Sequence, residues 1–299
     1  HEDYTLKILF QSSMTDDLKK EFSDFEPKHI AQIMDRDLKT DDDFFMDRGF
    51  NYRPILSQIV SSELDVDRMD YLLRDSFYCG TSYGQIDSDW LISNLTFHNQ
   101  NGMIHLALNR RALYTFDDFL LSRLHMFLMV YFHHKAIVYD EMLLRYLKSK
   151  DCDFSLPAKI QEYVEFDDYK LHSHLKQSSN DLARMIAERR PYRLLFESHF
   201  EDGQKNLTLN QSRVKKLEDQ GIDVIYTSSS GSLSKYYSGQ ITKAPDIFVV
   251  ENNHIEPLKI SKIEESTQIF SRYESARKIE RIYVPPHLYE AAKTGLGVK

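Results

Sequence analysis

Apolar residues up to about residue 190 recur mostly three and four positions apart, the spacing that places side chains on one face of an α-helix. We expect helices over residues 1–12, 15–22, 27–35, 53–60, 65–77, 87–95, 110–148, 155–163, 167–176 and 178–188. Only 10 glycines and 8 prolines are spread over the 299 residues, so few positions interrupt these runs. The sequence up to residue 190 therefore predicts a body rich in helices.

Two regions depart from the helical spacing. Residues 99–109, NQNGMIHLALN, combine a turn signal with a short alternating segment, which predicts a small β-hairpin. From Arg193 onward, β-branched and aromatic residues dominate the runs YRLLFESHF, IDVIYTSS, DIFVV, IEPLKISKI and ERIYV. The predicted fold class is mainly α, with a helical lobe over residues 1–190 and a smaller α+β lobe over residues 191–299 that contains an antiparallel sheet.

Composition narrows the possible partners. Hydrophobic residues make up 41% of the chain, which is enough for a sizeable core, and the net charge of −8 offers no overall attraction to nucleic acid or to an anionic membrane. No stretch approaches the roughly 18–20 apolar residues of a membrane span, and the first residues lack the layout of a signal peptide. Because the only cysteines are Cys79 and Cys152, we expect no disulfide framework and a cytoplasmic location.

The expected helix over residues 65–77 carries an unusual polar face. Asp65 can cap its first turn, and apolar residues project elsewhere toward a core. The polar side holds Asp67, Tyr71, Arg74 and Asp75. One interpretation is an amphipathic helix with a solvated face, on which Asp70 and Arg74 form an ordinary ion pair. The other interpretation is a binding surface that uses the carboxylates and the phenol together.

A second candidate surface lies within residues 122–143. Arg123, Phe127 and Tyr131 recur four residues apart, and a guanidinium beside a phenol suits a phosphate and a ring or sugar. The alternative is that this apolar stripe is simply core. His133 and His134 are adjacent, and because neighbours on a helix point about 100° apart, we do not expect both to bind one metal ion.

Three segments resemble a known family. LDVDRMDYLLRD, followed by YGQID, is similar to the last motif of the HD-domain phosphohydrolases, in the deoxynucleoside triphosphate (dNTP) triphosphohydrolase branch that includes the vertebrate sterile-alpha-motif/HD-domain enzyme. HEDYTLKIL resembles the segment in which a His-Glu pair follows the HD dipeptide, and SRLHMFLMVYFHHK resembles the Arg-x7-Tyr-x-His helix. The likeness covers residues 1 to about 140 and continues more weakly to about 197.

This resemblance implies a role for individual residues. Asp67 matches a carboxylate ligand of a divalent metal ion, such as Mg, Mn, Fe, Zn or Ni, and His1 matches a catalytic-pocket histidine. The substrate-binding positions are Arg68 and Arg123 for the triphosphate, Tyr71 for the sugar, Asp75 for the 3′-hydroxyl and Tyr131 against a 2′-hydroxyl. Arg111 and Arg193 match positions for a regulatory nucleotide, although Trp90 and Asn109 stand where the vertebrate enzyme has basic residues. The family's first His and its HD dipeptide have no match in this sequence.

The resemblance also implies an activity and an assembly. The activity is metal-dependent hydrolysis of a dNTP to the deoxynucleoside and inorganic triphosphate, and the assembly is a homo-oligomer, either a dimer or a tetramer. Two alternatives stay open: hydrolysis of another phosphoester by the same kind of centre, and a non-catalytic module for nucleotide binding or oligomerisation. No membrane or nucleic-acid partner is expected.

Overall fold

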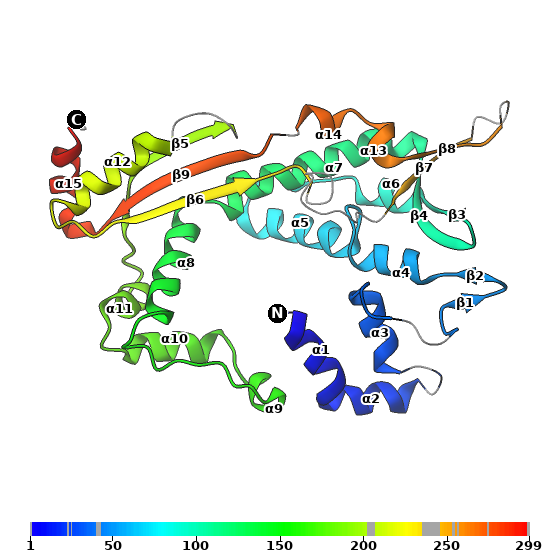
Figure 1. Ribbon diagram of the computed structural model, residues 1–299, viewed down its shortest axis with the longest axis horizontal. Helices are drawn as coiled ribbons and strands as arrows, with labels where there is room; N and C mark the ends of the chain where they lie inside the picture. The colour runs from blue at the N-terminus through cyan, green and yellow to red at the C-terminus, as the bar shows by residue number, and fades with distance from the viewer. Residues whose placement is uncertain are drawn as a thin grey trace. The chain divides into compact units, whose positions relative to one another are not determined.

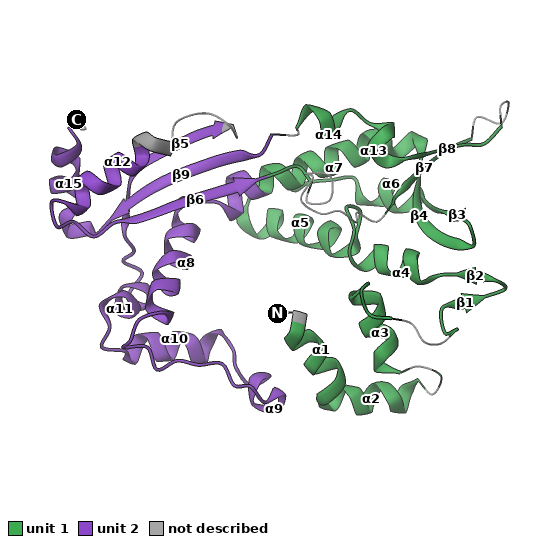
Figure 2. Cartoon of the chain, in the orientation of Figure 1, with its two compact units in different colours: residues 1–126, 232–274 green, residues 127–231, 275–299 purple. Residues whose placement is uncertain are grey.

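Figure 1 shows a computed structural model of the chain. It describes residues 2–22, 24, 26–39, 43–201, 207–234, 246–252, 255, 257–273 and 275–297. The chain divides into two compact units, and neither is continuous in sequence (Figure 2). Unit 1 comprises residues 1–126 and 232–274, and unit 2 comprises residues 127–231 and 275–299.

Unit 1 combines helices with a mixed sheet. Its helices are α1 (Glu2–Gln11), α2 (Ser13–Glu21), α3 (Pro27–Met34), α4 (Arg53–Val60), α5 (Val66–Cys79), α6 (Ser88–Ser93), η1 (Arg110–Ala112), α7 (Leu113–Met126), α13 (Ile263–Ser266) and α14 (Ile269–Arg272). Its strands are β1 (Met46–Asp47), β2 (Phe50–Asn51), β3 (Leu95–Gln100), β4 (Met103–Asn109), β7 (Phe248–Glu251) and β8 (Lys259–Lys262). The strand order is β1-β2-β4-β7-β8, and β3 pairs with β4.

The hairpin predicted near residues 99–109 is confirmed as β3 and β4, which pair antiparallel from Leu95↔Leu108 to Gln100↔Met103. Asn101 and Gly102 form its turn with φ values of 55° and 83°. Two successive positive φ values are typical of the tight turn that matches the twist of a hairpin, and Asn-Gly adopts them readily. The turn chemistry visible in the sequence therefore specified this element.

Unit 2 contains a three-stranded antiparallel sheet with the order β5-β9-β6. The strands are β5 (Arg193–Glu201), β6 (Ile225–Gly231) and β9 (Arg277–Val284). Its helical elements are η2 (Phe127–Tyr131), α8 (His134–Leu147), α9 (Ile160–Tyr163), α10 (Asp168–Gln177), α11 (Asp181–Ala187), α12 (Leu207–Glu218), η3 (Pro286–Leu288) and α15 (Tyr289–Leu296).

The predicted fold class, mainly α with a smaller α+β portion, is confirmed. The strands expected in one C-terminal lobe are distributed over both units, however. β7 joins unit 1 because it pairs in parallel with β4, with Leu108 opposite Val249. The division into lobes at residue 190 stays a prediction about domains.

One expected element is corrected. The continuous helix over residues 110–148 is wrong, because α7 ends at Met126 and the next turn, Phe127–Tyr131, is π-helical. The amide of Phe132 donates to the carbonyl of Phe127 at 2.8 Å, the five-residue spacing of a π turn. His133 then caps α8, and its Nδ1 accepts from the amide of Lys135 at 3.4 Å.

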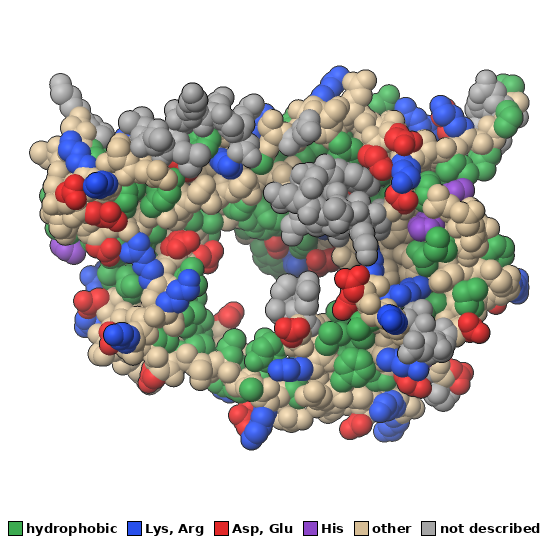
Figure 3. Space-filling model, in the orientation of Figure 1, with side chains coloured by type: hydrophobic (Ala, Val, Ile, Leu, Met, Phe, Trp, Pro, Cys, Tyr) green, Lys and Arg blue, Asp and Glu red, His purple; other side chains and the backbone are tan. Residues whose placement is uncertain are grey.

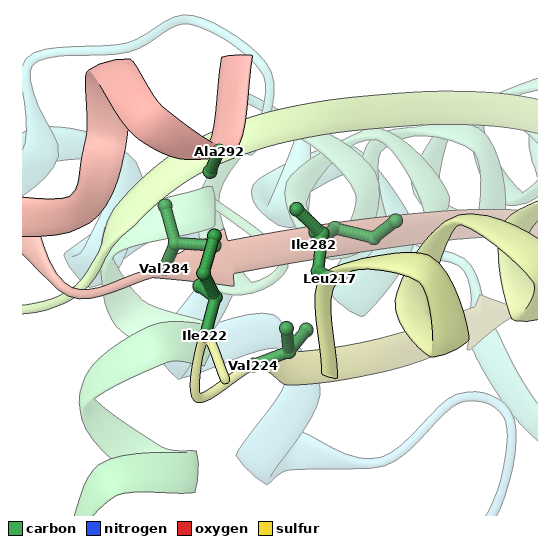
Figure 4. Close-up of a cluster of buried hydrophobic side chains, with 6 residues drawn as sticks. All are labelled: Leu217, Ile222, Val224, Ile282, Val284 and Ala292. Atoms are coloured by element: carbon green, nitrogen blue, oxygen red, sulfur yellow. The ribbon is translucent and has the colours of Figure 1, made fainter. Parts of the chain in front are cut away.

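One core cluster of unit 2 forms where α12 and α15 pack on β9. Figure 4 shows this cluster, which consists of Leu217, Ile222, Val224, Ile282, Val284 and Ala292. Val284 and Ile282 are fully buried, and the partly buried Leu195 and Tyr289 pack against the cluster. Apolar burial from three separate segments thus stabilises this sheet.

The surface carries both signs of charge. On the face shown in Figure 3, acidic and basic side chains are interspersed on unit 1 and on unit 2. Within the described ranges, no helix is both long enough and apolar enough to cross a bilayer.

Replacing the buried Val284 by alanine should lower the free energy of unfolding by about 2 kcal/mol or more, because the change removes buried methyl groups and leaves a cavity. Val164, which is 54% exposed in the same unit, provides the matched control. Val164→Ala should change stability by less than about 0.5 kcal/mol. Urea denaturation followed by circular dichroism measures both variants, and equal losses would contradict the packing in Figure 4.

Candidate functional site

Helix α5 begins at a carboxylate that caps it. Asp65 accepts a hydrogen bond from the amide of Arg68 at 2.8 Å and another from the amide of Ser62 at 3.1 Å. Burial raises the pKa of the Asp65 carboxyl above its usual value, although Arg68 and the two amide bonds oppose that rise. At its other end α5 stops at Gly80, whose φ of 65° is left-handed.

Beside this cap lies a buried ion cluster centred on Glu63. Glu63 is 1% exposed, and its Oε2 lies 3.4 Å from Nη1 of Arg68 and 3.7 Å from Nη2 of Arg123. The two arginines come from α5 and α7. Ser234 donates a hydrogen bond to Oε1 of Glu63. We call Glu63, Arg68 and Arg123 the Glu63 cluster.

Backbone carbonyls hold the arginines of the Glu63 cluster in place. Arg68 donates to the carbonyl of Ser62, and its Nη1 lies 3.7 Å from Oδ2 of Asp65. Arg123 donates to the carbonyl of Leu233. Nε of Arg123 is buried and makes no hydrogen bond within the described part of the chain. The cluster therefore keeps two cations close together and leaves one buried donor unused.

The two arginines of the Glu63 cluster act electrostatically on Tyr71. Burial lowers the pKa of Arg123, whereas Glu63 raises it, and a guanidinium stays protonated in either case. Burial raises the pKa of the Tyr71 phenol, and Arg123 and Arg68 oppose that rise. The phenol is thus uncharged at neutral pH and lies within the field of both arginines.

Three residues expected in one site are therefore gathered together: Arg68, Tyr71 and Arg123. Glu63 was not predicted from the sequence, although it lies two residues before Asp65 in the same run, SSELDVD. Nothing in its spacing links Glu63 to Arg123, which is 60 positions further along. A charged residue next to a capping motif is the only sequence signal that could have drawn attention to it.

The other acids on α5 differ in environment. Asp67 is exposed in the first turn, and Asp75 is half-buried with Oδ1 at 3.7 Å from Nε of Arg74. Arg74 also pairs with Asp70, which confirms that part of this face is an ordinary solvated ion pair. Asp67 is therefore sterically open to a ligand, whereas Asp70 is engaged.

A metal site does not emerge from these residues alone. Across the described ranges, no group of three or more His, Cys, Asp or Glu side chains is arranged to hold a metal ion. A structural metal needs about four ligands, so Asp67 can be only one of several. His1 lies outside the described residues.

The loop after α5 packs against that helix through a glycine. A side chain at Gly84, in the YGQID motif, would collide with the carbonyl oxygen of Leu72. Only a residue without a Cβ atom fits there unless the backbone shifts. The glycine of this motif therefore positions the loop on α5.

Tyr131 lies in the π-helical turn and is half-buried. Its ring packs edge-on against Phe127, with 5.0 Å between ring centroids. The π turn adds a residue to the helical repeat, so the four-residue spacing of Arg123, Phe127 and Tyr131 does not run along one regular α-helix. Arg123 belongs to unit 1 and Tyr131 to unit 2.

The candidate regulatory arginines each cover an aromatic ring. Arg111 lies 5.3 Å from the centroid of Trp90 and donates to Asn94, all within unit 1. Arg193 lies 3.8 Å from the centroid of Tyr289 within unit 2. Arg193 also lines a pocket of about 640 Å³.

Comparison with known proteins places these observations in context. Residues 86–225 match the family described as "HD associated region". An uncharacterized protein of Methanocaldococcus jannaschii is 31% identical over 155 residues, which is 52% of this chain and 34% of that protein. An uncharacterized protein of Mycoplasma pneumoniae is 24% identical over 307 residues, which is 90% of this chain and 68% of that protein. The chain thus spans about a third of the length of the archaeal relative.

Solved structures share the fold. The crystal structure of a hypothetical protein from Aquifex aeolicus superposes with a TM-score of 0.74 at 23% identity, covering 97% of this chain and 70% of that one. The crystal structure of a phosphohydrolase from Bacteroides thetaiotaomicron superposes with a TM-score of 0.58 at 20% identity, covering 91% of this chain and 70% of that one. The family match covers residues 86–225, and the two solved structures show a shared fold.

Glu63→Gln should lower the free energy of unfolding by about 3–5 kcal/mol, because it removes the carboxylate between two buried guanidiniums. Glu162, 58% exposed and 3.2 Å from Lys159, is the control, since exposed ion pairs contribute only about 0–1 kcal/mol. Denaturant titration of Glu63→Gln and Glu162→Gln compares them. A loss no larger than that of the control would mean that Glu63 does not balance the two arginines.

Proposed function

We propose that this chain forms part of an HD-type phosphohydrolase that converts a dNTP to the deoxynucleoside and inorganic triphosphate. The observation that carries the proposal is the convergence of Arg68 and Arg123 on Glu63, close to the Tyr71 phenol. Arg68, Tyr71 and Arg123 belong to the segments that resemble the dNTP triphosphohydrolases. The phosphohydrolase from Bacteroides thetaiotaomicron, which shares the fold, supports the general reaction class.

The Glu63 cluster suits a polyphosphate for an electrostatic reason. A triphosphate requires several cations at close range, and two guanidiniums without a counter-charge would repel each other. Glu63 offsets that repulsion, so the arginines are close together before any ligand arrives. The unused buried Nε of Arg123 is the donor that we assign to a phosphate oxygen. Such preorganised donors stabilise charge that develops during phosphate transfer.

The sugar would be recognised along α5. Tyr71 and Asp75 are four residues apart and therefore on the same side of this helix. An ionised carboxylate accepts a hydrogen bond well, so Asp75 would bind the 3′-hydroxyl of the deoxyribose. The uncharged Tyr71 phenol would pack against the sugar ring. For Tyr131, which belongs to unit 2, the role of excluding a 2′-hydroxyl is what the resemblance implies.

For the divalent metal, the proposal is limited to one ligand. Asp67 is exposed at the start of α5, next in sequence to Arg68, and the described residues offer no complete set of ligands around it. A bound metal ion would polarise the phosphate. The whole protein would then require metal ligands in addition to Asp67. Separately, we propose that the whole protein assembles as a dimer or tetramer, which light scattering would test.

Asp67→Ala should abolish metal retention and reduce dNTP hydrolysis by at least about a hundredfold, a loss in keeping with a metal contribution of several kcal/mol. The whole protein is incubated with each dNTP and Mn²⁺ or Mg²⁺, and the products are separated as triphosphate, pyrophosphate and phosphate. Asp70→Ala is the matched control, because Asp70 lies on the same helix but pairs with Arg74.

Three outcomes of this assay are distinct. Triphosphate release that depends on Asp67 and not on Asp70 supports the proposal. Release of pyrophosphate or phosphate alone would favour another phosphoester reaction. Intact dNTPs that nevertheless bind would favour a non-catalytic nucleotide-binding module.

Tyr131→Ala should reduce the preference for dGTP over GTP by about tenfold or more, because a lost steric clash of about 1.4 kcal/mol changes a rate ratio tenfold. Asp75→Ala should instead lower kcat/KM for both nucleotides by about 10–150-fold, the usual effect of losing a hydrogen bond to a charged group, and keep their ratio. Steady-state kinetics with both nucleotides compares the two variants. An unchanged ratio in Tyr131→Ala would assign the ring to packing alone.

A further inference from the structure

Unit 1 contains a pocket that is separate from the Glu63 cluster. It encloses about 310 Å³, near the lower end of the range for small-molecule sites. The residues that line it include Arg36, Arg53, Pro54, Ser57, Met103 and His105, and the lining comes from the segment after α3, from β2, from α4 and from β4. It shares no residue with the cluster.

Two buried polar atoms of this pocket lack a partner. Ser57 is 2% exposed, yet its Oγ makes no hydrogen bond with any residue the structure describes, and the same holds for Nε2 of His105. Leaving a buried polar group unpaired is energetically unfavourable. Because both atoms belong to residues that line one pocket, a ligand in that pocket could satisfy both.

The walls of the pocket are fixed by hydrogen bonds. The Gln58 side chain accepts from the amide of Leu106 at 2.8 Å and donates to the carbonyl of Asp246 at 2.6 Å, which fastens α4 to the sheet. Arg53 is also held in place, since its side chain donates to four backbone carbonyls at 2.7–3.1 Å. These are the carbonyls of Gln32, Asp35, Arg36 and Leu38.

The hydrogen bonds of Arg53 use its Nε and Nη2, and within the described ranges no bond involves its Nη1. The site is therefore organised before a ligand binds.

The charge of the pocket favours an anion. Arg36 and Arg53 line it, and its lining includes no Asp or Glu. Arg53 and Pro54 also form the first turn of α4, where the aligned peptide dipoles add partial positive charge. Burial lowers the pKa of His105, against the opposing effect of Asp246, so this ring is neutral at pH 7 and can still form a hydrogen bond.

We propose that this pocket binds a small organic carboxylate with an apolar body. The carboxylate oxygens would accept hydrogen bonds from Nη1 of Arg53 and Oγ of Ser57, and the apolar body would pack on Pro54 and Met103. A charge-assisted hydrogen bond is about twice as strong as a neutral one, which favours a carboxylate over an amide of the same shape. The small volume and apolar walls favour it over a strongly hydrated inorganic phosphate.

The test uses isothermal titration calorimetry of the whole protein with benzoate, phenylacetate and isovalerate as probes. At least one should bind with a Kd of about 1 mM or tighter, in keeping with the limits for ligands of this size. Benzamide and inorganic phosphate are the comparison probes, and each should bind at least about tenfold more weakly, since neither offers both the charge and the apolar body.

Ser57→Ala should weaken binding of the carboxylate by about tenfold or more. Ser57→Val should abolish binding, because the larger side chain also fills the pocket. Neither variant should lower the thermal stability, since Ser57 Oγ has no partner to lose. Ser93→Ala, an exposed serine on α6, should bind like the unaltered protein. No saturable binding of any of the three carboxylates, equal binding of benzamide, or unchanged affinity in Ser57→Ala would each overturn the proposal.

Discussion

The need to neutralise buried charge organises unit 1. Two arginines, one from α5 and one from α7, are nearly excluded from water, and burying a cation without compensation costs several kcal/mol. Glu63 supplies the compensation from the loop that precedes α5. The Ser62 and Leu233 carbonyls take up further donors. Three segments distant in sequence are thereby brought to one point.

Burial also gives two neighbouring acids, Asp65 and Asp67, different roles. In the run LDVD, Asp65 is buried and its carboxylate is used to cap α5 and to face Arg68, whereas Asp67, two residues later, remains exposed. A carboxylate already bonded to two amides has little capacity left for a ligand. Of these two acids, Asp67 is therefore the one whose carboxylate has capacity left for a ligand.

The π-helical turn at Phe127–Tyr131 coincides with the point at which unit 1 gives way to unit 2. A π turn shifts the register of the residues after it, so Tyr131 is presented differently from a residue on a regular helix. Such turns are frequent at functional sites, and this one lies in the segment that resembles the Arg-x7-Tyr-x-His helix. The irregularity and the candidate specificity residue therefore fall at the same place in the chain.

Local patterns in the sequence determined much of the secondary structure of this protein. Helical spacing predicted most of the helices of unit 1, Asn101-Gly102 specified the hairpin, and Asp65 marked the start of α5, because each depends on interactions within a few residues. Tertiary structure alone decided the rest. Glu63 meets Arg123 across 60 positions, and β7 joins β4 across about 140, so neither pairing leaves a local periodicity that sequence reasoning can detect. The π turn likewise interrupts a run with helical apolar spacing throughout, since packing and not propensity chooses between the two kinds of helical turn.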